Sequence, residues 1–108
     1  MQTKEFLFEQ VNPGLHIEIQ NEDCLSALKR AKDNTFDLVL TSPPYNVGKS
    51  YETKVSIEKY LETQEEIISE LVRILSNRGN LCWQTGNFVD KGEVFPLDIY
   101  CYRIFNYK

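Results

Sequence analysis

Two consecutive prolines, Pro43 and Pro44, constrain the fold of this chain more than any other feature. They follow an apolar run at residues 36–40, which has the length and branching of a buried strand. Proline fixes its own φ, has no amide hydrogen and restricts the residue before it, so neither a strand nor a helix can continue through the pair. We therefore expect the chain to leave its sheet here in an extended turn.

The residues around the prolines predict a pocket for a flat, amino-bearing ring. Ligands of open α/β sheets bind at the carboxyl ends of the strands, where this turn lies. The Ser42 hydroxyl and the Pro43 carbonyl can accept the two protons of an exocyclic amino group, which frees a lone pair otherwise shared with the ring. Tyr45 offers a face on which a base can stack after it has left its duplex.

Strands and helices alternate along the rest of the chain, which predicts an α/β fold. Residues 1–14 are expected to form an irregular arm. Short right-handed connections would place the last strand beside the one that precedes the prolines. We predict strands at residues 15–20, 36–40 and 81–84, and helices at 23–31, 56–75 and 96–107.

The helix at residues 56–75 has the clearest pattern, because its apolar residues recur at steps of three and four. Ser56 can cap its start, and Gly79 is expected to end it just past Arg78. The predicted inner face consists of Ile57, Tyr60, Leu61, Gln64, Ile67, Ile68, Leu71, Val72 and Leu75.

No set of residues has the spacing of a metal site, so we expect none. The single histidine, His16, falls on the polar phase of its strand and is expected at the surface. Cys82 and Cys101 lie in apolar segments and are predicted to be buried, reduced thiols. Trp83 is expected to belong to the core rather than to stack on a base.

Composition limits the function of the 108-residue chain. A hydrophobic fraction of 42% and a charged fraction of 26% are typical of a soluble globular domain. No run is long enough to span a membrane and no signal-peptide stretch is recognised, so a cytoplasmic location is expected. The net charge of −4 argues against this chain binding DNA unaided, although Lys49 and Lys54 flank the predicted pocket.

The tetrapeptide Ser42-Pro43-Pro44-Tyr45 after an apolar strand resembles the catalytic motif of the amino-group DNA methyltransferases, which methylate cytosine N4 or adenine N6 with S-adenosylmethionine. Residues 21–28, with Asp23, resemble the lead-in to that motif, and residues 80–89 and 95–99 resemble the following strand and helix. The resemblance extends over about residues 15–107.

The resemblance implies a partial Rossmann-like fold, with three α/β/α layers around a short, mainly parallel sheet. It implies S-adenosylmethionine as the cofactor, with Asp23 beside the adenine of that molecule, although capping the helix would also explain an acidic residue there. The implied site residues are Ser42, Pro43, Pro44 and Tyr45 for catalysis, Asp23 and Ser42 for the cofactor, and Asn46 and Lys49 for the substrate.

Two parts of such an enzyme are not recognised in the sequence. None of the five glycines forms a Gly-x-Gly turn after a strand, where the methionine end of the cofactor would bind, and no target-recognition segment is evident. We expect residues 15–108 to be a partial catalytic domain that is inactive alone and that meets DNA through a completed enzyme. We further expect a missing C-terminal half or a homo-oligomer, with Tyr100, Tyr102, Phe105 and Tyr107 as the open surface.

Other functions stay open at this level. The chain could be a non-catalytic remnant or an oligomerising half-domain, or a methyltransferase of RNA or protein. Glutamine methylases of the last kind would carry Asn at position 42, which disfavours that alternative. The sequence leaves open whether the target is adenine or cytosine, which DNA site is read, whether the chain is a truncation or half of a split enzyme, and whether a restriction enzyme accompanies it.

Overall fold

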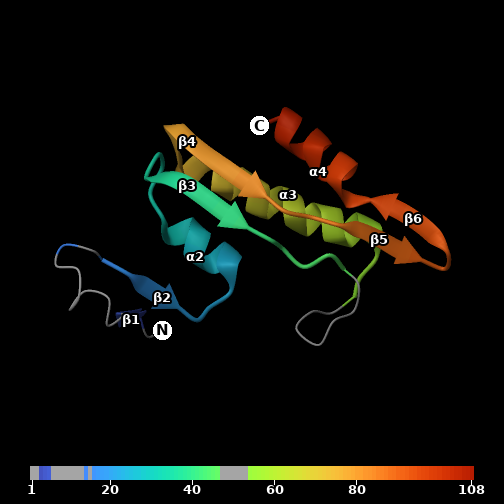
Figure 1. Ribbon diagram of the computed structural model, residues 1–108, viewed down its shortest axis with the longest axis horizontal. Coiled ribbons are helices and arrows are strands. Elements are labelled where there is room, and N and C mark those ends of the chain that lie inside the picture. Colours follow the sequence, from blue (N-terminus) through green and yellow to red (C-terminus); the bar gives the residue numbers. More distant parts are fainter. Residues whose placement is uncertain (1–2, 6–13, 15, 47–53) are drawn as a thin grey trace.

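Two parallel strands, β3 (Phe36–Thr41) and β4 (Leu75–Trp83), form the centre of the molecule (Figure 1). The computed structural model describes residues 3–5, 14, 16–46 and 54–108. The register pairs Leu38 with Asn80 and Thr41 with Trp83, and it shifts between Phe36 and Leu38. The predicted strands at residues 36–40 and 81–84, and their adjacency, are confirmed.

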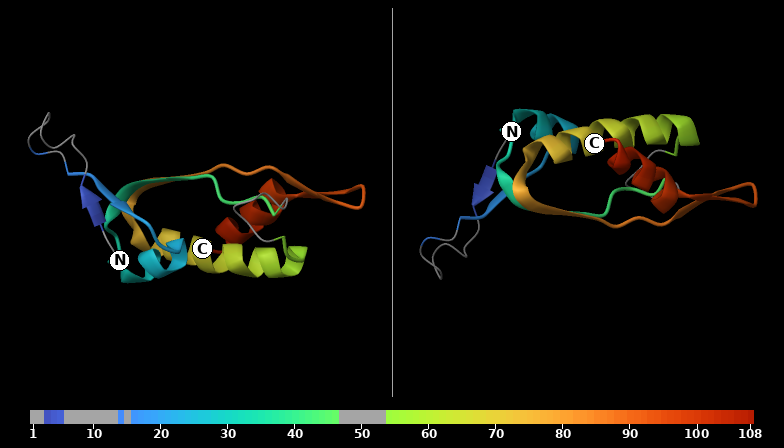
Figure 2. Two further views of the ribbon diagram at one scale, coloured as in Figure 1. Left: turned by 90° about the horizontal axis from the view of Figure 1, so that it is seen from below. Right: turned by 90° about the horizontal axis from the view of Figure 1, so that it is seen from above.

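Three helices lie on one face of this pair of strands: α2 (Cys24–Arg30), α3 (Ile57–Ile74) and α4 (Leu97–Asn106) (Figure 2). The described residues therefore form two layers. A short parallel sheet with helices agrees with the expected α/β class. A second helical layer, which the expected three-layer arrangement requires, is not among the described residues.

Helix α3 begins where Ser56 accepts a hydrogen bond from the Lys59 amide, 3.2 Å away, as the sequence predicts. It ends at Ile74 rather than near Gly79, because Leu75 is already extended and leads directly into β4. A Cβ at Gly79 would lie 3.0 Å from the Phe36 carbonyl oxygen and 2.7 Å from Leu75 Cδ1. The expected role of Gly79 as a helix end is therefore wrong, and this glycine instead permits a close approach of two strands.

Helix α2 begins at Asp23, whose carboxylate accepts a hydrogen bond from the Ser26 amide at 3.1 Å. The predicted cap is confirmed. Arg73 of α3 ties the two helices together, because its guanidinium donates to the carbonyl oxygens of Leu28 and Ala31 at 2.7 and 2.8 Å. The Leu28 carbonyl also accepts from the Ala31 amide at 3.0 Å, so Arg73 adds a second hydrogen bond at the C-terminal end of α2.

The N-terminal residues include a strand that the sequence did not predict. β1 (Thr3–Glu5) pairs antiparallel with β2 (Glu18–Gln20), so the expected irregular arm is wrong for residues 3–5. Residues 6–13 lie outside the described part of the chain. His16 is exposed, as expected, and its Nε2 lies 3.6 Å from the Glu18 carboxylate.

A hairpin of β5 (Asn87–Asp90) and β6 (Glu93–Pro96) precedes α4 and was also not predicted. Its two-residue turn places Lys91 at φ 50° and Gly92 at φ 83°, the left-handed values that such tight hairpins require. Pro96 lies directly before α4, and the predicted last helix is confirmed.

The core lies between α3, α4 and the hairpin. Among the described residues, the buried hydrophobic side chains are Tyr60, Ile68, Leu71, Ile74, Phe88, Leu97 and Cys101. Trp83 is half-buried and packs edge-on against Phe105, with ring centroids 5.6 Å apart, consistent with its expected core role. None of the described helices is long and apolar enough to cross a membrane.

Cys82 is exposed, so its predicted burial is wrong, whereas Cys101 is buried as expected. Alternation along β4 turns Leu81 and Trp83 toward the helices, and it puts Cys82 on the opposite face beside Leu40. Leu38 and Leu40 are 60% and 76% exposed on that face. An apolar strand therefore does not guarantee burial of both faces here.

Candidate functional site

The double-proline turn begins where β3 ends. The Gln84 amide donates to the Thr41 carbonyl at 2.9 Å, which extends the parallel pairing to the last residue before Ser42. The prolines that follow can donate no further ladder hydrogen bonds, and the chain turns away. The predicted site residues Ser42, Pro43, Pro44 and Tyr45 thus lie at the carboxyl end of a central strand.

Ser42 and Tyr45 face each other across this turn. Their hydroxyl oxygens are 3.1 Å apart and share a hydrogen bond. Ser42 is exposed and Tyr45 is half-buried, so the pair lies at the surface and part of the Tyr45 ring packs against the protein. The arrangement offers a hydroxyl acceptor and a flat aromatic surface within the same small region.

The Tyr45 ring rests on Gly86. A Cβ at Gly86 would lie 3.2 Å from two ring carbons of Tyr45, closer than side chains normally pack. The ring also packs against the buried cluster of Tyr60, Phe88 and Leu97. The ring position is therefore set from outside the tetrapeptide, by the β4–β5 connection and by α3.

Tyr60 fixes the backbone of the turn. Its hydroxyl donates to the Pro44 carbonyl oxygen at 2.6 Å, and its side chain is 5% exposed. The Pro44 carbonyl is therefore already engaged. Sequence reasoning assigned Tyr60 only to the inner face of its helix; a hydroxyl among aliphatic core residues was the signal that it also serves a polar group.

The Asn46 side chain is hydrogen-bonded to the backbone of Val55. Its side-chain amide donates to the Val55 carbonyl at 2.7 Å and accepts from the Val55 amide at 2.8 Å. The residue has φ 62° and is 2% exposed. The expected position of Asn46 on the pocket rim is therefore wrong for its side chain, which is buried and joins residues 46 and 55.

Asp23 and Lys49 are the remaining predicted site residues. Asp23 is exposed, and its Oδ2 accepts from both the amide and the hydroxyl of Ser26. Lys49 lies outside the described residues. Lys54 lies 3.7 Å from the Asp90 carboxylate and 5.1 Å from the centre of the Phe88 ring, so its charge already has partners within the protein.

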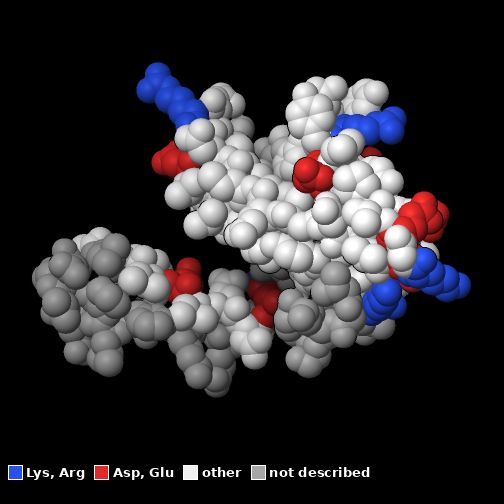
Figure 3. Space-filling model, turned by 45° about the vertical axis from the view of Figure 1, so that its right-hand side comes forward, with Lys and Arg blue, Asp and Glu red and all other residues white. Residues whose placement is uncertain are grey.

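Among the described residues on one face of the molecule, basic side chains do not form a continuous surface (Figure 3). On the face shown in Figure 3, lysine and arginine side chains are scattered and alternate with acidic ones. Within the part of the chain that the structure describes, no group of three or more His, Cys, Asp or Glu residues could hold a metal ion. The described site offers hydroxyl and carbonyl groups and an aromatic ring.

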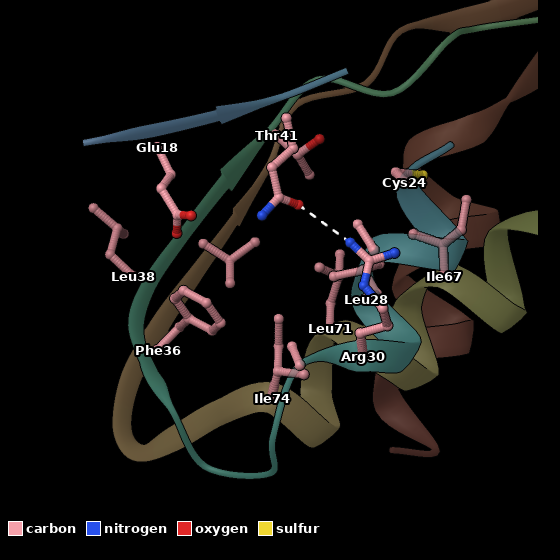
Figure 4. A pocket seen from close by; sticks show the side chains of 14 residues that line it. Glu18, Cys24, Leu28, Arg30, Phe36, Leu38, Thr41, Ile67, Leu71 and Ile74 are labelled. Atoms are coloured by element: carbon pink, nitrogen blue, oxygen red, sulfur yellow. Dashed lines mark hydrogen bonds between the residues drawn. The ribbon is translucent and has the colours of Figure 1, made fainter. Parts of the chain in front are cut away.

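A hollow of about 720 Å³ opens beside the site, between β2, β3, α2 and α3 (Figure 4). Arg30 crosses it and hydrogen-bonds the Glu22 carboxylate at 2.6 Å and the Gln20 side chain at 3.5 Å. The hydrogen bonds between Arg30 and Glu22 lower the pKa of Glu22 below its ordinary value of 4.5 and raise the pKa of Arg30. The lining is mainly apolar and includes Ala27, Leu28, Ala31, Phe36, Leu38, Val39, Ile67, Leu71 and Ile74.

Comparison with protein families identifies residues 36–108 as a match to the DNA methylase family of the N6 and N4 type. The chain is 42% identical over 95 residues to the type II methyltransferase M.BglII of Bacillus subtilis. The aligned residues cover 86% of the chain and 26% of that protein. It is 38% identical over 78 residues to the type II methyltransferase M.ScaI of Streptomyces caespitosus, covering 69% of the chain and 25% of that protein.

A more distant relative is the DNA adenine methyltransferase YhdJ of Escherichia coli, 28% identical over 90 residues, which cover 80% of the chain and 29% of that protein. The chain thus spans about a quarter of the length of these curated relatives.

Proposed function

The chain belongs to the DNA methylase family, and from this premise we propose that it supplies the base-binding side of an enzyme that methylates an exocyclic amino group in DNA. The target would be adenine N6 or cytosine N4. One observation carries the proposal: the hydroxyl groups of Ser42 and Tyr45 lie 3.1 Å apart at the carboxyl end of β3. A small acceptor beside an aromatic face suits a base that has been turned out of its duplex.

Each residue of the turn has a separate task in this proposal. The Ser42 hydroxyl and the Pro43 carbonyl accept hydrogen bonds from the two N–H groups of the amino group, which makes its nitrogen a better nucleophile. The Pro44 carbonyl already accepts from Tyr60, which leaves Pro43 as the backbone acceptor of the pair. The Tyr45 ring stacks on the base, and its hydroxyl exchanges the bond with Ser42 for one with the incoming ligand.

Two exposed residues that follow the carboxyl ends of strands fit a cofactor. Asp23 follows β2 and Ser42 follows β3, and in Figure 1 these strands point in the same general direction. Both hydrogen bonds that hold Asp23 use Oδ2, so an exposed carboxylate can still accept from a hydroxyl or amino group of a nucleoside. Bound S-adenosylmethionine would supply the methyl group by breaking its bond from sulfur to the methyl carbon, leaving the neutral thioether, and the amino nitrogen would lose one proton to solvent.

DNA would be bound mainly by other parts of the enzyme. The net charge of −4 and the pairing of Lys54 with Asp90 leave little positive charge here for phosphates. Lys49 would contact the sugar–phosphate backbone of the DNA. Asn46 is buried, so it would assist substrate binding by holding its own position against the Val55 backbone.

The test is methyl transfer by a hybrid enzyme in which this chain replaces the matching 95 residues of the Bacillus subtilis relative. DNA is incubated with S-adenosylmethionine carrying a labelled methyl group and is then digested to nucleosides. We expect label in N6-methyladenine or N4-methylcytosine. Label confined to C5-methylcytosine, or a folded hybrid that transfers nothing, would contradict the proposal.

A further inference from the structure

Hydrogen bonds tie the double-proline turn to the start of α3 on both sides of Tyr45. Before Tyr45, the Pro44 carbonyl accepts from the Tyr60 hydroxyl at 2.6 Å. After it, the Asn46 side chain donates to the Val55 carbonyl at 2.7 Å and accepts from the Val55 amide at 2.8 Å. Val55 lies just before α3, and Tyr60 lies in the first turn of that helix. The start of α3 therefore supports the backbone around Tyr45.

The backbone of the turn itself has few ways to move. The rings of Pro43 and Pro44 fix two φ angles. A following proline also restricts the ψ of Ser42 and of Pro43, and the peptide bonds are planar. The soft torsions between the Pro43 carbonyl and the Tyr45 side chain are therefore the ψ of Pro44 and the φ of Tyr45. Both torsions rotate the peptide group whose oxygen accepts from Tyr60.

The Tyr45 side chain is sensitive to such a rotation. A Cβ at Gly86 would lie 3.2 Å from two carbons of its ring, and the ring also packs against the buried cluster that includes Tyr60. The Tyr45 hydroxyl lies 3.1 Å from that of Ser42. A change in either soft torsion would move the ring off Gly86 and away from the Ser42 acceptor.

We propose that Tyr60 is a positioning residue for methyl transfer, because its hydroxyl holds the peptide group that sets the Tyr45 ring relative to the Pro43 acceptor. Tyr60 is 5% exposed and acts through the turn rather than on the substrate. A misplacement of about 1 Å can cost about a hundredfold in rate. Loss of the hydroxyl should therefore slow the transfer step without weakening the binding of DNA or cofactor. The inference rests on the proposed function for the reaction that these groups serve.

The position of the Tyr45 ring can be followed in the 108-residue chain without cofactor or DNA. One Gly86 hydrogen points in the direction of the missing Cβ and faces the ring, so the ring current shifts its resonance. A chain labelled with ¹³C at the glycine Cα atoms has only five labelled positions. Tyr60→Phe keeps the aromatic ring and removes the hydroxyl, and we expect the Gly86 signal to move toward its value in Tyr45→Ala. Tyr100→Phe, at a half-buried tyrosine packed against the same cluster, should leave the signal in place.

Methyl transfer by the hybrid enzyme tests the consequence for the reaction. Tyr60→Phe should lower kcat about tenfold or more, while KM for DNA and for S-adenosylmethionine changes less than about threefold. Tyr100→Phe should keep the wild-type kcat. The hybrid with 4-aminophenylalanine at position 60 retains a hydrogen-bond donor on the ring and should recover most of the rate. Urea unfolding of each variant shows that the rates compare folded proteins.

Four results would overturn the inference: a Gly86 signal that Tyr60→Phe leaves in place, a Tyr60→Phe hybrid with the wild-type kcat, a loss of kcat that Tyr100→Phe matches, or a Tyr60→Phe chain that does not fold. In the last case Tyr60 would serve stability rather than position. If the hybrid with the unaltered chain transfers no methyl group, the proposed function fails, and the Gly86 signal alone decides whether Tyr60 positions Tyr45.

Discussion

Tyr60 determines how the double-proline turn is held, although it lies sixteen residues further along the chain. The tetrapeptide itself was predictable, because Ser42 to Tyr45 are contiguous and two prolines leave the backbone few choices. The residues that hold this segment in place were not predictable in the same way. Tyr60, Gly86 and Val55 reach the turn only through the tertiary fold, so a linear pattern does not reveal them.

At the residue scale we predict that Asn46→Gly destabilises the chain by about 1–3 kcal/mol, because two part-buried hydrogen bonds to the Val55 backbone are lost, each contributing about 0.5–1.5 kcal/mol. Glycine tolerates φ 62°, so backbone strain does not contribute. Asn34→Gly is the matched control, since Asn34 has φ 53° and is exposed. Urea unfolding measures both, and equal midpoints for the two variants would refute the role of Asn46.

The helix boundaries that depend on local hydrogen bonds agree with the sequence-based predictions, whereas those that depend on tertiary packing do not. Asp23 and Ser56 cap their helices as predicted, because a cap needs only a side chain three residues before an amide. The end of α3 differs from its prediction, because Ser76 donates to the Asp37 carboxylate at 2.7 Å and the chain continues as β4. The β5–β6 hairpin was missed although Asp90-Lys91-Gly92 is a turn signal.

The capping and cofactor roles of Asp23 can be separated with two variants. Asp23→Ser keeps a good cap and removes the carboxylate, so the free energy of unfolding should change by less than about 0.5 kcal/mol, whereas Asp23→Ala should cost about 1 kcal/mol. If Asp23 contacts the cofactor, both variants should weaken S-adenosylmethionine binding by the hybrid enzyme. If calorimetry shows that Asp23→Ser binds S-adenosylmethionine with unchanged affinity, Asp23 acts only as a helix cap.

The link between β2 and α2 should make stability depend on pH in the acid range. Hydrogen bonds from Arg30 lower the pKa of Glu22 below 4.5 in the folded chain. A lowered carboxyl pKa stabilises the fold above the unfolded value, and this contribution is lost as pH falls through the folded value. Glu22→Gln should therefore flatten the stability profile below about pH 4.5 relative to the wild type. Parallel acid-unfolding curves for the two proteins would contradict this.

The whole molecule is more open than a closed domain of its size. Its radius of gyration is 16.1 Å, against about 13 Å expected for a compact chain of this length. Sequence alternation predicted a sheet with helices but could not show that all described helices cover one face. Exposed apolar side chains lie on β3, at Phe36, Leu38 and Leu40, and also on the β5–β6 hairpin, at Val89 and Val94. Tyr102 and Tyr107 of the predicted aromatic surface are exposed as well.

This open face predicts self-association of the chain alone. We expect light scattering at micromolar concentration to give a mass above 12.6 kDa, most simply that of a two-fold dimer. Leu40→Glu, on the open sheet face, should restore the monomer, whereas Thr63→Glu, at an exposed polar position of α3, should not. A wild-type chain that stays at 12.6 kDa would show that this apolar surface does not drive association.

The most direct test of the account is methyl transfer by the hybrid enzyme carrying Ser42→Ala and Tyr45→Ala. Tyr45→Ala alone should cost about 1–3 kcal/mol of base stacking, and loss of the Ser42 acceptor adds to it. Because Tyr45 also packs on Gly86, unfolding is measured in parallel, and Thr63→Ala on the exposed side of α3 is the control. We predict that the double variant stays folded and binds DNA but loses methylation, while Thr63→Ala keeps it; methylation at the wild-type rate by the double variant would contradict the assignment of the double-proline turn as the base pocket.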